Sequence, residues 1–438
     1  MLNKAKFTNY LILALLILSS GSVLNILGIN NIIQTTLFVL VLIIAINKGV
    51  LKNIKNVSAL LFILLSVLIL FLLQAAEYGK LSIFFNNNNI SIFLLIFTCL
   101  LVCFCFFSKP NFLLYLNSIL YVYTLHAIIS SVIISLFPTK NVLFTSADEG
   151  AKYVGHLYTF FQRVNVNYFG NLEPNFINYF GFELQRAHGL SWEPGNFSVY
   201  VNVFIFLNLY IFKNRRNVII GVIGLVLAWS TSGLLVMLIQ FSYFFIVNFN
   251  KFSAKNIIPK VLIGSVVSYV LVTATIGNYN EKIYGDRSGS GASRFLNTAS
   301  ALYTIYNNPF IGTGFSFENY TNQLNKSISN SQSLTSSYVD SSSLDKVAST
   351  NSFLRIYVQF GIPIGLFFTI CLFKQTLIPS HKFIFAVIII VSTSSAPLMM
   401  TPFYFLFVIS GFLAMLEKKK PPIKYYIYND ATNLKKLP

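Results

Sequence analysis

Charged residues are scarce in this 438-residue chain, at 10% of the sequence, whereas an average soluble domain has about 25%. The shortage goes together with 55% hydrophobic residues, a mean hydropathy of +0.68 and long uncharged runs. Four of these runs are Leu11–Leu18, Ala59–Leu73, Ser91–Phe107 and Phe383–Val391. Because about 20 apolar residues in a helix span a bilayer, the composition excludes a soluble globular core and predicts a membrane protein.

Acidic residues are the scarcest charged group, 13 against 31 Lys and Arg, which leaves a formal net charge of +18. If the N-terminus is inside, the predicted inner segments hold 20 of the 31 bases and only two acids, Glu417 and Asp430. The outer side then has 11 bases and 11 acids. This is the positive-inside pattern. It predicts membrane lipids rather than nucleic acid as the partner of the bases, and places both termini in the cytoplasm.

Cysteine is also rare, and all four cysteines lie within predicted spans, at Cys99, Cys103, Cys105 and Cys371. They are expected to be small buried apolar residues and not disulfides or metal ligands. No histidine pair has metal-ligand spacing, and no phosphate-binding loop or nucleophile elbow is present. The sequence therefore predicts neither a metal nor another cofactor.

The apolar runs predict an all-α polytopic membrane protein with about twelve transmembrane helices and two large outer loops. The expected spans are 8–28, 31–47, 57–76, 90–108, 112–137, 195–212, 217–230, 233–249, 260–276, 352–373, 383–399 and 401–416. The chain then divides into regions of alternating character. These are N-terminal helices 1–137, a first outer loop 138–192, central helices 193–276, a second outer loop 277–351, C-terminal helices 352–416 and a basic tail 417–438.

Residues 217–249 are long for one span and have a polar turn, Ser230-Thr231-Ser232-Gly233, at their middle. Turn residues of this kind satisfy their own backbone groups, so we expect two short helices that meet at an outer turn. The alternative is one kinked helix. That alternative inverts everything downstream and puts the basic clusters outside, so the distribution of charge argues against it.

The second loop contains a predicted amphipathic helix at residues 293–307, which Asn307-Asn308-Pro309 ends. One apolar face of this helix is formed by residues at helical spacing, namely Phe295, Ala299, Leu302, Tyr303 and Tyr306. We expect the helix to lie on the membrane surface.

The predicted spans have no charged residue away from their ends. Ion-coupled transporters need ionisable residues within the membrane, so transport is disfavoured and chemistry is expected in the outer loops. The sharpest cluster there runs from Arg186 through His188 and Trp192 to Glu193, directly before Pro194. An arginine is a fork for phosphate or carboxylate, and a glutamate near a helix start is suited to accept a proton from a hydroxyl. The alternative is an interfacial anchor, since Trp and Arg often lie at helix ends.

Four further arginines are candidates for binding a substrate diphosphate or glycan: Arg163 in the first loop, Arg287 and Arg294 before the surface helix, and Arg355 at the start of the tenth span. Snorkelling to lipid head groups is the alternative for the last three. The first loop is also rich in aromatic residues, whose faces bury the apolar faces of sugars. An interfacial aromatic belt is the other interpretation of these rings.

Four motifs, in this order on the predicted topology, carry a resemblance to a known family. They are Arg186-x-x-Gly189 with Glu193-Pro194, then Ser230–Gly233, then Arg294 with Asn308-Pro309-Phe310-Ile311-Gly312-Thr313-Gly314, and finally Asn351-Ser352-Phe353-Leu354 with Phe360-Gly361-Ile362-Pro363-Ile364-Gly365. Together they resemble the bacterial O-antigen polymerases of the Wzy type and the related O-antigen ligases. The resemblance implies the multi-helix lipid-sugar transferase (GT-C-like) fold, with the two outer loops in the periplasm.

The resemblance also implies an activity in the inner membrane. A polymerase joins oligosaccharide repeat units carried on undecaprenyl diphosphate, and a chain-length regulator protein is a possible partner. Arg186, Arg287 and Arg294 would hold the leaving diphosphate, and Glu193, with His188 second, would act on the acceptor hydroxyl. Ligases carry a histidine beside the asparagine at the start of the helix after the second loop, but here Thr350 precedes Asn351. A polymerase is therefore favoured, with a ligase or a lipid-linked oligosaccharide flippase as alternatives.

Overall fold

The structure is a computed structural model of the full chain. The residues that it describes are 4–26, 29–78, 87–106, 111–136, 145–148, 151–156, 160–166, 172–174, 176–179, 182–248, 272–273, 276–277, 288–314, 351–416, 426–429 and 433–436. They form two compact units, which we describe separately. Unit 1 comprises Met1–Asn30, Leu113–Asp286 and Phe383–Ser392, and unit 2 comprises Asn31–Phe112, Arg287–Lys382 and Thr393–Pro438.

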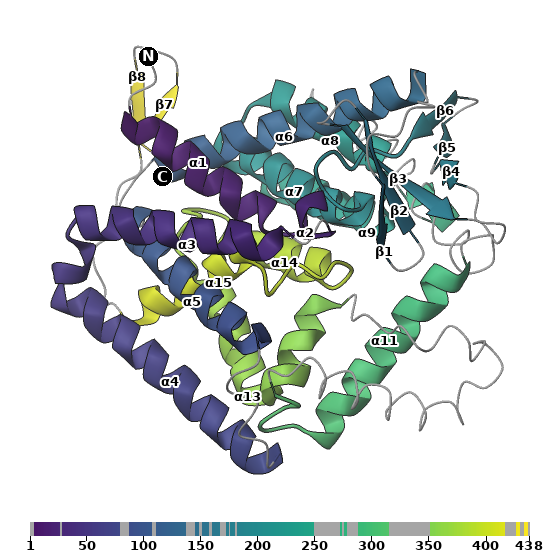
Figure 1. Ribbon diagram of the computed structural model, residues 1–438. Coiled ribbons are helices and arrows are strands. Elements are labelled where there is room, and N and C mark those ends of the chain that lie inside the picture. Colours follow the sequence, from purple (N-terminus) through teal and green to yellow (C-terminus); the bar gives the residue numbers. More distant parts are fainter. Residues whose placement is uncertain are drawn as a thin grey trace. The chain divides into compact units, whose positions relative to one another are not determined.

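The described part of the chain is mostly helical, as expected (Figure 1). The helices of unit 1 are α1 (Lys4–Leu18), α2 (Val23–Ile26), α6 (Asn111–Leu136), α7 (Pro194–Phe206) with its π-helical continuation η3 (Leu207–Ile211), α8 (Arg215–Ala228), α9 (Thr231–Asn248) and α14 (Lys382–Thr393). Those of unit 2 are α3 (Asn30–Asn47), η1 (Val50–Lys52), α4 (Ile54–Tyr78), α5 (Asn87–Phe106), α11 (Ser288–Asn307), α13 (Ser352–Lys374) and α15 (Pro402–Leu416).

Six of these helices are long and apolar enough to cross a membrane, which makes the chain a multi-pass membrane protein by length and composition. They are Asn30–Asn47, Val57–Gln74, Asn111–Leu136, Pro194–Ile211, Thr231–Asn248 and Ser352–Lys374. Shorter apolar helices lie in the expected spans near residues 8, 90, 383 and 401. The expected span 260–276 lies outside the described residues except at 272–273 and 276. The total of twelve spans stays a prediction.

Two expected spans are wrong at their C-terminal ends. The first, predicted to reach residue 28, ends at Leu18, because Gly21 has a positive φ of 81° and the hydroxyls of Ser19 and Ser20 bond the carbonyl of Leu16. The second, predicted to reach residue 399, ends at Thr393 and is followed by a turn. At the second place, Oγ of Ser352 on α13 donates to the carbonyl of Thr393 at 2.9 Å. In both places a serine hydroxyl therefore bonds a carbonyl that a longer helix would have bonded through its backbone.

Helix α7 lies at the centre of unit 1. Its contacts with α8 and α9 show in which direction each of these helices runs relative to α7. On α8, Gly224 lies near Phe197 and Gly221 near Ile205, so α8 runs antiparallel to α7. On α9, Gly233 lies near Ser198, and the backbone carbonyl of Gln240 accepts a bond from the hydroxyl of Tyr210 farther along the α7–η3 rod, so α9 runs parallel to α7. Helices α8 and α9 therefore form a hairpin. The expected turn at Ser230 is confirmed, and the single kinked helix is excluded.

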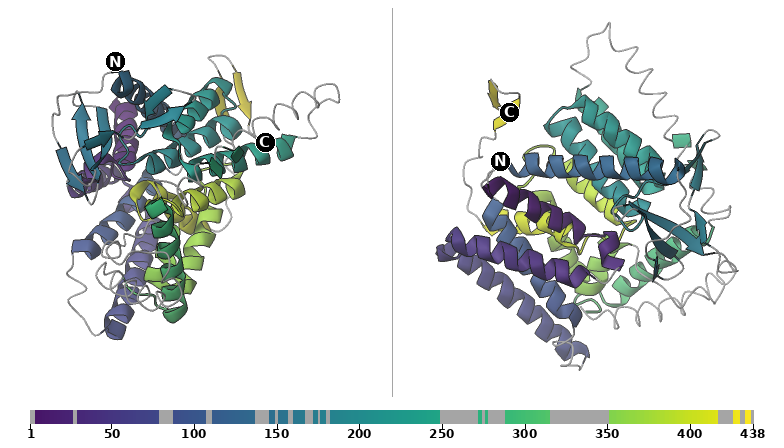
Figure 2. Two further views of the ribbon diagram at one scale, coloured as in Figure 1. Left: turned by 90° about the vertical axis from the view of Figure 1, so that its right-hand side faces the viewer. Right: turned by 45° about the horizontal axis from the view of Figure 1, so that its top comes forward.

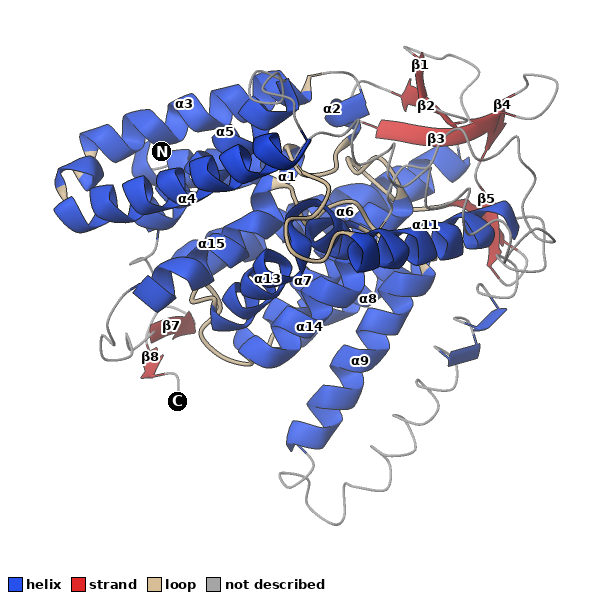
Figure 3. Cartoon of the chain, turned by 90° about the horizontal axis from the view of Figure 1, so that it is seen from below, coloured by secondary structure: helices blue, strands red, loops and turns tan. Residues whose placement is uncertain are grey.

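The first large loop is not the irregular segment that an all-α protein implies, because six short strands form in it (Figure 3). One antiparallel sheet has the order β1-β2-β3-β4, from β1 (Thr145–Asp148), β2 (Ala151–His156), β3 (Phe160–Val166) and β4 (Leu172–Pro174). A separate hairpin pairs β5 (Phe176–Tyr179) with β6 (Phe182–Gln185). The strands lie at the end of α6 from which the chain enters them (Figure 2). A third, two-stranded pair, β7 (Tyr426–Asn429) with β8 (Asn433–Lys436), lies in the tail.

In unit 2, α13 packs on α15 and α11 and is broken at Gly361, whose φ of 77° and ψ of 171° are not helical. Residues 309–314 lie against the break. The N–H of Thr313 bonds the carbonyl of Val358 at 2.7 Å, and the N–H of Ile362 bonds the carbonyl of Pro309 at 2.7 Å. Backbone groups of α13 that the break leaves without a partner in the helix are thus hydrogen-bonded by residues 309–314, as buried backbone requires.

Helix α11 confirms the predicted amphipathic helix but begins at Ser288, five residues before the predicted start. Three of its large apolar residues are exposed, namely Leu302 at 54%, Tyr303 at 40% and Tyr306 at 81%. The opposite face is buried and carries small or polar residues, namely Asn297, Ser300, Ala301 and Thr304. Small and polar residues are typical of helix contacts in lipid. The outward apolar face fits a lipid environment, and the surface position of α11 stays a prediction.

Candidate functional site

Residues 185–193 lead from strand β6 to α7, and side chains of α6 hold them in place. The N–H of Gln185 bonds Oγ of Ser135 at 2.8 Å, and the hydroxyl of Ser131 donates to the carbonyl of Gln185. The end of α1 holds the same segment from another side. The N–H of Val23 bonds the carbonyl of Leu190 at 2.8 Å. The segment is therefore fixed by two helices before α7 begins.

Arg186 lies at the C-terminal end of α8. Its Nε donates to the carbonyl of Ala228 at 3.1 Å, and its Nη2 donates to the carbonyl of Trp229 at 3.0 Å. Trp229 has a left-handed backbone (φ 46°, ψ 47°), which ends the helix there. The carbonyls at a helix end carry partial negative charge, so a cation is favoured at this place. Arg186 thus acts structurally as a cap of α8, a contact that the sequence did not predict.

His188 is buried, and its Nδ1 lies 2.8 Å from the carbonyl of Ser191. The next residue, Gly189, has a φ of 55°, and a Cβ there would lie 2.8 Å from the Cβ of Ala127 on α6. Only glycine suits this close approach and this backbone conformation. Gly189 of the sequence motif is therefore explained by packing of the turn on α6.

Two residues of α6 that sequence reasoning missed lie at this turn. The hydroxyl of Tyr123 lies 2.6 Å from Oγ of Ser191. His126 is a titratable side chain within a predicted span, and its Nδ1 would lie 3.3 Å from a Cβ on Gly189. An ionisable residue within a membrane helix is itself a signal of function, and that signal in the sequence identifies His126 but not Tyr123.

Glu193 directly precedes α7 with extended backbone (φ −149°, ψ 157°), and its carbonyl accepts the N–H of Phe197 at 3.1 Å. Pro194 occupies the first turn, as predicted. The carboxylate is partly exposed and lies over Gly195, where a Cβ would be 3.3 Å from Oε1. The side chain makes no capping bond to the helix. Glu193 thus lies at the positive end of α7, where a carboxylate is favoured.

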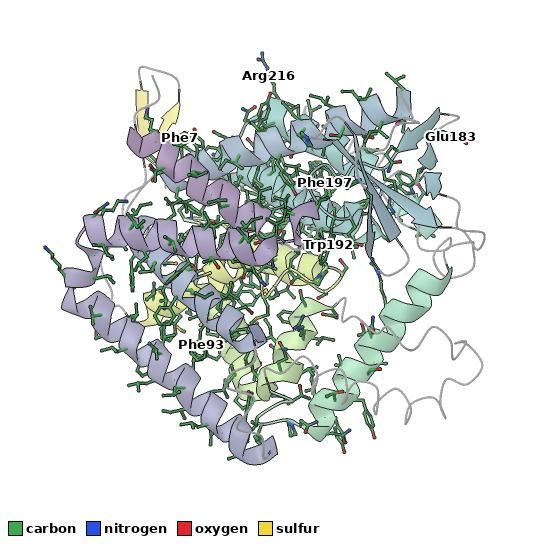
Figure 4. All side chains as sticks on the ribbon, viewed as in Figure 1. Phe7, Phe93, Glu183, Trp192, Phe197 and Arg216 are labelled. Carbon is green, nitrogen blue, oxygen red and sulfur yellow. The ribbon has the colours of Figure 1, made fainter. Side chains whose placement is uncertain are left out.

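Trp192 is also partly exposed, and its N–H bonds the carbonyl of Gly21 at 3.2 Å. In Figure 4, Trp192 and Phe197 mark the start of α7, with Phe197 inside unit 1, whereas Arg216 points away from the helices. The bases of the α7–α8 turn, Lys213, Arg215 and Arg216, are exposed at the opposite end of α8 from Arg186. One end of unit 1 therefore holds Arg186 and Glu193, and the other end holds these surface bases.

The polar turn at Ser230 belongs to the same end of unit 1. Ser198 on α7 lies close to it, with its Oγ 2.6 Å from the carbonyl of Gly195 and 3.3 Å from Oγ of Ser230. Gly233 allows this contact, since a Cβ there would lie 2.6 Å from the Cβ of Ser198. The structure thus brings two of the four sequence motifs, Arg186–Pro194 and Ser230–Gly233, together around the start of α7.

Buried amides continue from this end into α7. Nδ2 of Asn202 donates to the carbonyl of Gly233 at 3.1 Å, and Nε2 of Gln240 donates to Oδ1 of Asn202 at 2.9 Å. Asn196 is fully buried in the first turn, and neither of its amide atoms has a hydrogen-bond partner among the residues that the structure describes. Sequence reasoning missed Asn196, although an asparagine three residues after Glu193, at the start of a predicted span, was visible in the sequence.

The other two motifs come together within unit 2. Residues 309–314 pair with the break of α13, and a Cβ on Gly361 would lie 2.2 Å from the carbonyl oxygen of Phe310. At the start of α13, Oδ1 of Asn351 accepts the N–H of Leu354 at 3.0 Å and caps the helix. Oγ of Ser352 lies 2.7 Å from the carbonyl of Ala396. These motif residues have structural roles that hold α11, α13 and the turn after α14.

The remaining candidate residues are dispersed. Arg294 on α11 and Arg355 in the first turn of α13 are partly exposed residues of unit 2. Arg163 lies in β3, opposite Tyr153 of β2. Arg287 lies outside the described residues. Among the described candidates, Arg186, His188, Trp192 and Glu193 lie on one short segment of unit 1. A site that they share with Arg163, Arg294 or Arg355 stays a prediction.

Among the described residues, no group of three His, Cys, Asp or Glu could hold a metal ion.

Residues 217–370 match a family model described as O-Antigen ligase. The match runs from α8 to α13 and includes the Ser230 turn, Arg294 and Arg355, whereas Arg186 and Glu193 precede it. No curated protein matches the chain. No solved structure matches it either.

Proposed function

Because residues 217–370 match a family model described as O-Antigen ligase, we propose that the chain is a polymerase of the O-antigen ligase/polymerase superfamily, which joins lipid-linked oligosaccharide repeat units at the periplasmic face of the inner membrane. The family match carries this proposal. It implies a membrane enzyme of the glycosyltransferase kind that acts on lipid-linked oligosaccharides. The four sequence motifs fit polymerases and ligases alike, and Thr350, which stands where ligases carry a histidine, favours the polymerase.

In the proposed reaction, the growing glycan is transferred from undecaprenyl diphosphate to a hydroxyl of the next lipid-linked repeat unit. The bond between C1 of the donor sugar and the diphosphate oxygen breaks, and a bond from C1 to the acceptor oxygen forms. The acceptor's proton goes to the carboxylate of Glu193, and the leaving diphosphate carries the negative charge. Glu193 is suited to this role because it is a partly exposed carboxylate directly before α7.

The leaving diphosphate needs cations, because charge accumulates on its oxygens in the transition state. We assign this role to Arg287 and Arg294, with Arg355 as a further candidate. Arg186 retains a place in the proposal, but a changed one. Its guanidinium holds two carbonyls at the end of α8, so it positions the segment that leads to Glu193 and adds positive charge at the start of α7. His188 is second to Glu193, since its Nδ1 already contacts Ser191.

The proposed topology has both termini in the cytoplasm and the two large loops in the periplasm. The α8–α9 hairpin supports this topology, because it leaves the basic segments after α7 and α9 on one side of the membrane. A chain-length regulator protein is a proposed partner. A ligase is the second candidate, because the matched family model bears that description. A flippase or other transporter is the third.

Purified protein in liposomes tests the proposal directly. Supplied only with lipid-linked repeat units, the wild-type chain is expected to make a ladder of longer lipid-linked glycans. Glu193→Gln should abolish the ladder and leave the amount of folded protein unchanged, because glutamine keeps the size of the side chain and removes only its ability to accept the proton. Glu183→Gln is a matched control, since Glu183 is an exposed glutamate in strand β6 of the same unit (Figure 4).

The alternatives give different results. A ligase makes no ladder from lipid-linked units alone, but transfers one unit to a lipid acceptor that carries no repeat unit. A transporter makes neither product. In the host, deletion of the gene should leave surface glycan with a single repeat unit. Retention of the long glycan ladder after deletion would contradict the proposal.

A further inference from the structure

The loop between α13 and α14, residues 375–381, is packed closely within unit 2. Ile378 of this loop is fully buried. At the start of the loop, a Cβ on Gly411 of α15 would overlap the carbonyl of Cys371 and lie 3.0 Å from the backbone nitrogen of Gln375. Because α15 approaches so closely, the end of α13 has no room to shift. The loop therefore starts from a fixed position.

Gln375 holds the loop with one atom of its side-chain amide and leaves the other atom without a partner. The residue is fully buried. Its Oε1 accepts the N–H of Ile378 at 2.8 Å, and since that partner is a donor, the other amide atom is the nitrogen. Among the residues that the structure describes, this Nε2 has no hydrogen-bond partner. The amide is planar, so its unpaired donor lies beside the same turn of the loop.

Other donors lie in or next to this loop. The hydroxyl of Thr376 is buried and also lacks a hydrogen-bond partner in the described part of the chain. Lys374 ends α13 and is exposed, and Lys382 begins α14 and is half-buried. All of these residues belong to unit 2. Two ammonium groups and two buried polar groups without partners thus occur within nine residues.

The charges of the two lysines act on one another. Burial lowers the pKa of Lys382, which lies outside the expected span 383–399, and the charge of Lys374 lowers it further. Residues 374–382 contain no Asp or Glu that could offset these charges. An anion at this loop would favour the charged form of both lysines.

We propose that the α13–α14 loop binds a phosphate group through the side chains of Lys374, Gln375, Thr376 and Lys382. A buried donor without an acceptor is unfavourable, and each one in a native structure requires an explanation. Phosphate oxygens are strong acceptors that carry negative charge, and lysine binds them as a point charge. A tetrahedral phosphate offers oxygens in several directions, which suits donors on both ends of a loop better than a flat carboxylate does.

The phosphate has two possible sources, a lipid head group and free phosphate. The loop joins two apolar helices, so the lipid head groups are its expected surroundings. In the proposed topology it lies on the cytoplasmic side, where anionic lipids attract bases. The lipid is therefore the expected source. The segment that carries Glu193 belongs to unit 1, so this site goes beyond the proposed function and does not depend on it.

Lipid titration of the detergent-solubilised full-length protein, measured by native mass spectrometry, tests the inference. The probes are phosphatidylglycerol and diacylglycerol with the same acyl chains, which differ only in the phosphate-containing head group. Phosphatidylglycerol is expected to bind the wild-type protein about 25-fold more tightly, because each lysine near an anionic lipid contributes about fivefold. Lys374→Ala together with Lys382→Ala should remove this preference.

Gln375→Glu tests the buried amide without removing its bond to the loop. The carboxylate keeps an oxygen for the N–H of Ile378 and replaces the unpaired donor by an acceptor that repels phosphate. The preference for phosphatidylglycerol should be lost, while the unfolding midpoint without lipid should be unchanged or higher, because the new charge lies near two lysines. Thr376→Val, which deletes one hydroxyl, should weaken binding about fivefold.

Inorganic phosphate, added to the lipid-bound protein against chloride at equal ionic strength, distinguishes the two sources. If phosphate displaces the lipid, free phosphate is a ligand as well. If it does not, the site takes the lipid head group. Both results support a phosphate site.

Arg215→Ala together with Arg216→Ala is the matched control, since it removes two exposed bases from the α7–α8 turn of unit 1. This variant should keep the preference for phosphatidylglycerol at the wild-type value. The inference is overturned if the wild-type protein binds both lipids equally, or if Gln375→Glu binds phosphatidylglycerol normally. An equal loss for the arginine and lysine variants would also overturn it, because general surface charge would then explain the binding.

Discussion

Each unit has one segment that packs against the end or the break of a helix. The two segments differ in whether side chains or backbone groups hold them in place. In unit 1, residues 185–193 are held largely by side chains. Arg186 bonds the end of α8, Ser131 and Ser135 bond Gln185, and Tyr123 contacts Ser191. In unit 2, residues 309–314 are held largely by backbone groups at the break of α13. Glycine at 312 and 361 lets the two backbones touch, since a Cβ at either place would lie within 2.6 Å of a backbone atom.

The difference teaches which kind of substitution each segment tolerates. A backbone joint has no space for a Cβ but depends little on the side chains of its partners, so one added methyl group should break it. A joint made by side chains loses one bond at a time, and each lost bond costs about 1–3 kcal/mol when the group is charged or buried. A single substitution at the backbone joint of unit 2 is therefore expected to cause a large loss of stability. Substitutions at the side-chain joint of unit 1 should each cause a smaller loss.

Gly361→Ala should have the largest effect on stability. The new Cβ would lie 2.2 Å from the carbonyl oxygen of Phe310, at a φ of 77° that L-residues rarely adopt. Strain and overpacking together should cost about 3–5 kcal/mol, seen as a large fall in the unfolding midpoint of the protein in detergent. Gly49→Ala is the matched control. Gly49 has a φ of 63°, but only Cδ of Lys52, at 3.7 Å, would lie near its Cβ. An equal loss for both variants would show that backbone conformation, and not the close approach, governs the joint.

Arg186→Ala should be next. It removes two bonds from a charged donor to the carbonyls of Ala228 and Trp229, which should cost about 1.5–3 kcal/mol. Loss of elongation should accompany the loss of stability, because the segment before Glu193 is no longer fixed. Arg216→Ala, at the exposed opposite end of α8, is the control and should change neither. If Arg186→Ala abolishes elongation with an unchanged unfolding midpoint, the arginine acts on the substrate and not as a cap.

The contrast between the units also explains what could be predicted from the sequence. The span expected at 31–47 is α3 at Asn30–Asn47, and the span expected at 352–373 is α13 at Ser352–Lys374. Length and hydropathy are local properties, so such helices can be placed from local sequence. The break at Gly361 could not be predicted in this way. It depends on the backbone of residues 309–314, which lie about 50 residues earlier in the chain.

The candidate site shows the same limit. The sequence identified Arg186 and Glu193 as neighbours before a helix, and the structure agrees. It did not indicate that the partners of Arg186 are carbonyls at 228 and 229, because a backbone carbonyl has no signature in the sequence. The strands of the first loop were missed because aromatic residues occur on both faces and obscure the alternation of apolar and polar residues. Phe160 and Phe161, for example, are neighbours on opposite faces of β3.

Gln74→Leu sharpens the comparison, because it removes the side chain that supports the backbone joint. Nε2 of Gln74 on α4 bonds the carbonyls of Ile311 and Gln359 at 3.2 and 3.1 Å. Loss of both bonds should cost about 1–2 kcal/mol, which is less than the loss from Gly361→Ala if backbone contacts dominate. Ser66→Ala, on an exposed part of the same helix, removes only a bond to the carbonyl of Phe62 and should cost almost nothing. A loss for Gln74→Leu as large as that for Gly361→Ala would contradict the distinction between the two joints.

Tyr123→Phe should have the smallest effect. It deletes one hydroxyl that contacts Oγ of Ser191 at 2.6 Å, and a single neutral hydrogen bond contributes about 1 kcal/mol. The phenyl ring should keep its contacts with Phe197 and Tyr200, whose ring centres lie 6.1 and 5.4 Å away. Ser191→Ala and the double variant complete a mutant cycle. If the segment is held in steps, the coupling should equal this one bond. Tyr121→Phe on the same helix is the control. A coupling near zero would mean that the hydroxyl does not hold the segment, and that the bonds of Arg186, Ser131 and Ser135 position Glu193 without it.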